Sequence, residues 1–142
     1  MEARLSEVGL QEQAPCVLSP AAAPAHSFVV AVTWLDSGIP VVSVTGELDR
    51  ATAAALERPL LALCDAPPGA VIVDLTSCAF IDLRGLQVLL TAQERLERSK
   101  QPMVLVLAGL SMLKVFRMAR VDVLFHICPS LDEAVEGYGV NG

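Results

Sequence analysis

Aromatic residues are scarce in this 142-residue chain, where Phe, Trp and Tyr together make up 4% of the positions. No apolar run approaches the roughly 18 residues that a membrane-spanning helix needs. The first residues have neither the basic start nor the apolar stretch of a secretory signal. We therefore expect a cytoplasmic protein without membrane insertion, and a core built from aliphatic side chains.

Cysteine and histidine are too few and too widely spaced for a disulfide framework or a zinc site. The cysteines are Cys16, Cys64, Cys78 and Cys128, and the histidines are His26 and His126. In a reducing compartment such cysteines are expected to be free thiols. The sequence also lacks the nucleophile-elbow, phosphate-loop and dinucleotide-binding glycine motifs. We expect no enzymatic activity, no cofactor and no metal.

Hydrophobic residues, in contrast, make up 54% of the chain, and the formal net charge is −6. This composition is typical of one globular domain with a substantial core. The acidic balance argues against direct binding of nucleic acid, because phosphate backbones would be repelled. Residues 1–26 include a Pro- and Ala-rich stretch without helical or strand periodicity, which predicts a flexible N-terminal tail. The folded domain is expected over residues 27–142.

Short apolar segments alternate with amphipathic segments along that domain. Strands are expected at residues 28–34, 41–45, 70–73, 103–107 and 124–127, and helices are expected to start near residues 49, 82, 110 and 130. The order β-β-α-β-α-β-α-β-α predicts an α/β fold with a mixed, mostly parallel sheet and one antiparallel hairpin. Pro59 predicts a kink or break in the first helix, and residues 76–78 are expected to form a loop.

Two short motifs stand where strands end and helices begin. The first is Gly46-Glu47-Leu48-Asp49, and the second is Asp82-Leu83-Arg84-Gly85. Asp49 and Asp82 are suited to cap the following helices, because a carboxylate accepts hydrogen bonds from the free amides of a first turn. This capping role accounts for both carboxylates without acid/base catalysis.

Residues 41–53 and 71–86, which contain these motifs, resemble the STAS domain of anti-sigma factor antagonists and of sulfate-transporter tails. The resemblance covers about residues 28–137 and implies the STAS fold. It also implies a regulatory protein, a monomer or weak dimer alone, that binds an anti-sigma factor of the histidine-kinase-like ATPase type and so frees a sigma factor. The partner-binding residues that it implies are Glu47, Asp49, Asp82, Leu83, Arg84 and Gly85.

The chain departs from the family's pattern at the phosphorylation site. In antagonists the second motif usually reads Asp-Ser-Ser/Thr-Gly, and the hydroxyl before the glycine is phosphorylated by the partner kinase. Here Leu83 and Arg84 occupy the two hydroxyl positions, so the resemblance implies an antagonist without this switch. Three roles remain open for Arg84: a side chain extended into solvent, a direct contact with the partner, or a ligand for a bound anion.

Other interpretations remain open beside the leading one. The chain is alternatively an accessory STAS subunit of a membrane lipid transporter, or a module that senses an anion or a nucleotide. Cys78 and Cys64 are either packed, inert thiols or a redox input that replaces phosphorylation. The cations at positions 114, 117 and 120 form either a solvated face or a contact for an acidic partner.

Overall fold

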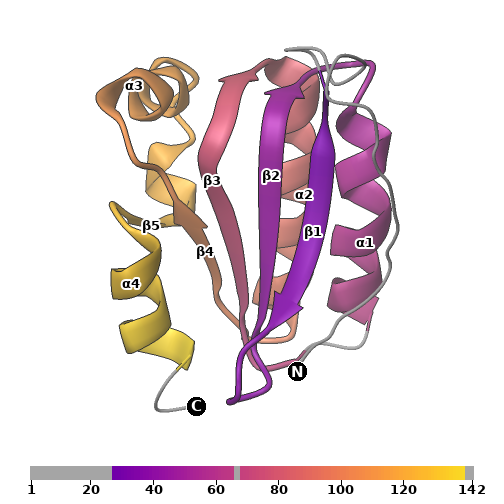
Figure 1. Ribbon diagram of the computed structural model, residues 1–142, viewed down its shortest axis with the longest axis vertical. Helices are drawn as coiled ribbons and strands as arrows, with labels where there is room; N and C mark the ends of the chain where they lie inside the picture. Colours follow the sequence, from indigo (N-terminus) through magenta and orange to yellow (C-terminus); the bar gives the residue numbers. More distant parts are fainter. Residues whose placement is uncertain (1–26, 66–67, 140–142) are drawn as a thin grey trace.

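The computed structural model describes residues 27–65 and 68–139. Within this part of the chain, five strands form one sheet in the order β1-β2-β3-β4-β5 (Figure 1). The strands are β1 (Val29–Trp34), β2 (Pro40–Leu48), β3 (Val71–Ile81), β4 (Met103–Val106) and β5 (His126–Cys128). β1 and β2 form an antiparallel hairpin, and every later pair is parallel. The expected fold class is confirmed.

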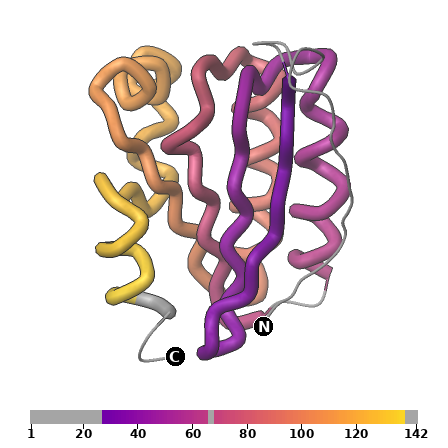
Figure 2. The backbone as a smooth tube through the Cα atoms, in the orientation of Figure 1, coloured from indigo at the N-terminus to yellow at the C-terminus, as the bar shows by residue number. Residues whose placement is uncertain are grey.

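The helices lie on both faces of this sheet. They are α1 (Ala53–Asp65), α2 (Leu83–Arg98), α3 (Leu110–Met118) and α4 (Leu131–Ala134), with a 3-10 turn η3 (Asp122–Leu124) and a π-helical turn η4 (Val135–Gly139). α1 and α2 lie side by side behind the sheet, and α4 lies on the opposite side (Figures 1 and 2). None of the helices in the described residues has the length and apolar character required to cross a membrane.

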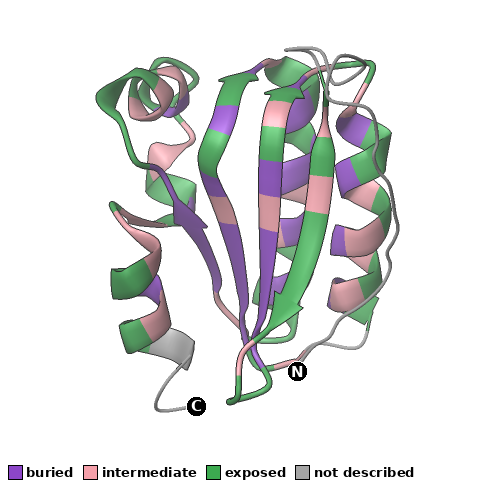
Figure 3. Ribbon diagram, in the orientation of Figure 1, coloured by how far each residue is buried: buried purple, intermediate pink, exposed green. Residues whose placement is uncertain are grey.

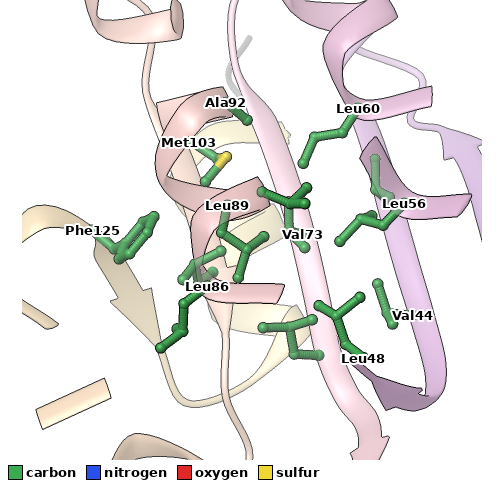
Figure 4. Close-up of a cluster of buried hydrophobic side chains, with 14 of the residues drawn as sticks. Val44, Leu48, Leu56, Leu60, Val73, Leu86, Leu89, Ala92, Met103 and Phe125 are labelled. Carbon is green, nitrogen blue, oxygen red and sulfur yellow. The ribbon is translucent and has the colours of Figure 1, made fainter. Parts of the chain in front are cut away.

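Two apolar clusters hold these layers together. The larger lies between the sheet and the helices α1, α2 and α3, and Figure 4 shows Leu48, Leu56 and Leu89 converging in it. The smaller lies under α4, where Ile72 and Val104 contact Ala134 and its neighbours. Burial on both faces explains why β4 is apolar at every position, as is typical of central parallel strands.

Two local predictions are corrected by the structure. Residues 76–78, expected to form a loop, belong to β3, which is 11 residues long and pairs with β2 up to Ile81. Two register shifts between β2 and β3 let the pairing continue through this polar stretch. Of the kink or break expected at Pro59, the break is wrong, because α1 continues through this residue while Leu56 and Leu60 anchor the helix on either side.

Candidate functional site

The two motifs meet at the edge of the sheet where the parallel strands end. Leu48 ends β2, Ile81 ends β3, and these two residues are paired in the ladder. The backbone N–H of Asp82 donates a hydrogen bond of 3.1 Å to the carbonyl of Leu48. Segments that are 33 residues apart in the sequence are therefore joined by their backbones, and both helix starts lie at this edge.

Gly85 makes the close contact between the motifs possible. A Cβ atom at this position would lie 2.7 Å from Cγ of Leu48 and 2.9 Å from Cγ1 of Ile81. Gly85 itself is buried, and only a residue without a side chain fits there without displacing its neighbours. The glycine thus sets the distance between the first turn of α2 and the end of β2.

Asp82 acts as the N-cap of α2, as the sequence predicts. Its extended backbone precedes the helix, and its Oδ1 accepts a hydrogen bond of 3.1 Å from the N–H of Gly85. A side-chain acceptor at this place satisfies one of the amides that a first helical turn leaves free. The cap therefore fixes the course of the backbone at Leu83 and Arg84, between the two bonded residues.

The expectation that Asp49 directly caps the first helix is corrected, because α1 begins four residues later at Ala53 and Asp49 organises the turn before it. Its Oδ1 accepts hydrogen bonds from the N–H groups of Ala51 (2.9 Å) and Thr52 (3.1 Å). The Thr52 hydroxyl in turn accepts from the Asp49 N–H at 2.9 Å and lies 2.7 Å from the Glu47 carbonyl, to which it donates. This network holds the turn rigid and leaves the Glu47 side chain exposed.

Arg84 forms an ion pair across the two helices. Its Nη2 lies 3.7 Å from Oε1 of Glu57 on α1, and the two side chains keep 44% and 33% of their surfaces exposed. None of the three roles expected for Arg84 included this pairing. The Glu57 carboxylate offsets the positive charge and competes with any other anion, so the geometry argues against an anion site at this arginine.

Apolar side chains are exposed beside these charged groups. Leu83, in the first turn of α2, keeps 68% of its surface accessible, and Phe80, near the end of β3, keeps 49%. Phe80 is paired with Glu47 in the ladder between β3 and β2. We call the exposed groups of Glu47, Phe80, Leu83 and Arg84 the edge surface. Apolar residues bordered by charges are typical of surfaces that bind another protein.

Comparison with known proteins assigns the chain to a family. The family model described as "Mlab, STAS domain" matches residues 33–127. The chain belongs to the STAS family. A curated relative, the anti-sigma-F factor antagonist RsfB of Mycobacterium tuberculosis (strain H37Rv), is 29% identical over 109 residues, which cover 76% of this chain and 88% of the relative.

Solved STAS structures share the fold. An anti-sigma factor antagonist from Mycobacterium paratuberculosis matches with a TM-score of 0.73 and 30% identity, covering 86% of this chain and 98% of that one. The murine anion transporter Slc26a9 matches 79% of this chain with 22% of its own, at a TM-score of 0.62 and 18% identity. This second likeness shows the fold alone.

The STAS core encloses the two cysteines proposed as redox inputs. Cys78 is a buried residue of β3 and not of a loop, and its Sγ donates to the Phe80 carbonyl at 3.3 Å. Cys64 is buried in α1, with its Sγ 3.7 Å from the Ala92 carbonyl. Desolvation by burial raises the pKa of both thiols above the ordinary value of 9.0. The thiolate, which is the reactive form, is therefore disfavoured at both positions.

Two residues that shape this STAS site, Thr52 and Glu57, were not predicted from the sequence. Thr52 had a weak local signal, since threonine hydroxyls often bond to nearby backbone groups in turns. Glu57 had none, because its contact with Arg84 depends on how α1 packs against α2. Lys114 and Arg117 on α3 and Arg120, which follows the end of that helix, are exposed and lie outside the edge surface.

Proposed function

We propose that this chain is an anti-sigma factor antagonist that binds its partner through the edge surface. The observation that carries the proposal is the joining of the two motifs, since it brings exposed Leu83 and Arg84 beside exposed Glu47 on a rigid scaffold. Caps at Asp49 and Asp82 fix both turns. A rigid surface loses little conformational freedom on binding, which favours affinity. Relatives at 29–30% identity, which are named anti-sigma factor antagonists, support the same function.

The partner that we propose is an anti-sigma factor of the histidine-kinase-like ATPase type. Binding of that factor frees a sigma factor, so the chain acts on transcription without touching DNA, in keeping with its net charge of −6. Because Arg84 and Leu83 carry no hydroxyl group, the association is not switched by phosphorylation at this helix start. We propose that it takes place in the cytoplasm.

Titration of purified anti-sigma factors of this class, taken from the source organism, tests the proposal directly. Wild-type protein is expected to bind one of them and to release its sigma factor. Leu83→Asp is expected to weaken binding at least about tenfold, since buried apolar anchors carry much of an interface's energy. Val123→Asp is the matched control, because Val123 is 82% exposed on η3, outside the edge surface. Equal binding by both variants would contradict the proposed surface.

Incubation with the partner kinase and ATP tests the absence of the switch. No phosphate is expected within residues 76–86. Thr76 and Ser77 are exposed on β3, so they are accessible hydroxyl groups and make the test meaningful. Phosphate at either position would show that the switch has moved along the strand rather than disappeared. Recovery of an ATP-binding cassette protein instead of an anti-sigma factor would favour the alternative role in lipid transport.

A further inference from the structure

The outer edge of β1 has no partner strand among residues 27–65 and 68–139. β1 is the first strand in the sheet order, and among the described residues it pairs with β2 alone. A strand in this position presents a row of unpaired N–H and C=O groups, which is a template for pairing with another chain. Figure 3 shows that most residues of β1 are also exposed to solvent.

β1 lacks the features that usually protect such an edge. Its sequence, Val-Val-Ala-Val-Thr-Trp, contains no charge, proline or glycine, and its register with β2 is free of bulges. Val29, Val32 and Trp34 keep 53%, 38% and 56% of their surfaces exposed. The opposite edge differs, because β5 has only three residues. Lysine, proline, bulges and shortness are the common means of preventing edge pairing, and β1 has none of them.

The absence of charge along β1 allows a second copy of this chain to be its partner. Two copies that each carry a net charge of −6 repel one another over most of their surfaces. Residues 27–35 form a stretch of nine positions without a charged side chain. Along this stretch two copies can approach without placing like charges opposite one another, and an apolar strand is complementary to itself.

We propose that the protein forms a homodimer in which β1 pairs antiparallel with β1 of a second copy. A two-fold axis perpendicular to the sheet relates the copies, as in most dimers of identical chains. Opposite residues in an antiparallel ladder point to the same face. Val30, Val32 and Trp34 lie opposite Val44, Val42 and Pro40 of β2, and Val42 and Val44 face α1 and α2. In the dimer, Val30, Val32 and Trp34 of one copy therefore lie beside the same three residues of the second copy, on the face of the sheet that packs against α1 and α2.

Sedimentation equilibrium of the full chain tests this pairing. From about 1 to about 200 µM, wild-type protein is expected to shift from monomer to dimer, a range that corresponds to moderate affinity. Val32→Lys is expected to weaken the dimer at least about tenfold, because two like charges would face each other near the axis. Val123→Lys is the matched control, since it introduces the same charge at an exposed valine of η3, and it is expected to leave the dimer unchanged.

Trp34 provides a second measurement that needs no variant. It is the single tryptophan of the chain, so its emission is expected to shift to shorter wavelength as the dimer forms and buries it. A monomer at the highest concentration, or equal weakening by the two lysine variants, would overturn the proposal. Dimerisation only after removal of residues 1–26 would overturn it as well, because the N-terminal segment would then be what covers β1 in the full chain.

Discussion

Gly85 lies so close to Leu48 that a methyl group on its Cα would approach Cγ of Leu48 to 2.7 Å. The two residues belong to different motifs, and Leu48 is fully buried. Their contact brings the start of α2 against the end of β2, beside the backbone hydrogen bond from Asp82 to Leu48. The geometry of the edge surface thus depends on the absence of a side chain at one position.

Gly85→Ala is expected to lower the free energy of unfolding by about 1–3 kcal/mol, the usual cost of overpacking a core. The atoms that would clash are Cγ of Leu48 and Cγ1 of Ile81, which lie close to the backbone and not at the far ends of their side chains. Urea unfolding measures the change. Gly137→Ala is the control, because nothing lies within 4 Å of a Cβ atom there. Similar losses in both variants would contradict the steric explanation.

Asp82→Ala is expected to destabilise the protein by about 0.5–2 kcal/mol, because the N–H of Gly85 loses its acceptor. Asp82→Asn should retain nearly all the stability, since an amide oxygen caps a helix about as well as a carboxylate. Thermal and urea unfolding of the two variants make the comparison. An equal loss with asparagine would mean that the negative charge, and not the hydrogen bond, stabilises this helix start.

Arg84→Ala and Glu57→Ala are each expected to change the free energy of unfolding by less than about 0.5 kcal/mol. Their ion pair is 3.7 Å long and well exposed to solvent, so water and salt screen it. A double-mutant cycle from urea unfolding would measure the coupling between the two side chains. A coupling well above 1 kcal/mol would show that the pair holds α1 and α2 together.

Arg84→Ser is expected to create a phosphorylation site for the proposed partner kinase. The new hydroxyl would stand in the first turn of α2, where free amides and the helix dipole favour a phosphate group. Mass spectrometry after incubation with kinase and ATP would locate the phosphate. The control is Arg84→Ala, which offers no acceptor at this position. The absence of phosphate at residue 84 of the serine variant would contradict the prediction.

Cys64 and Cys78 are expected to react with iodoacetamide at pH 8 at least about tenfold more slowly in the folded protein than in denaturant, because the thiolate is the nucleophile. Burial raises the pKa of both thiols in the folded state only. The stability that this shift contributes is therefore present below the ordinary value of 9.0 and is lost as pH rises above it. Peptide mapping separates these residues from the other cysteines. Rapid labelling of native Cys78 would restore the redox hypothesis.

Local sequence signals predicted much of the fold and part of the site. Apolar runs located three of the five strands, β1, β4 and β5, to within about two residues, and they placed β3 and β4 in the core. Asp82 was recognised as a cap from its own neighbourhood. β3 was predicted too short, because its polar residues 76 and 77 resemble a loop, whereas pairing with β2 through register shifts keeps them in the strand.

By itself, the sequence determined where α2 begins, which apolar segments are buried and that no hydroxyl group stands at positions 83 and 84, because each of these follows from residues close together in the chain. Only the tertiary structure decided that Arg84 pairs with Glu57, that Cys78 is enclosed and that β1 is the first strand of the sheet. Those relationships join residues that are distant in the sequence. They depend on how whole helices and strands pack, and no short pattern encodes that packing.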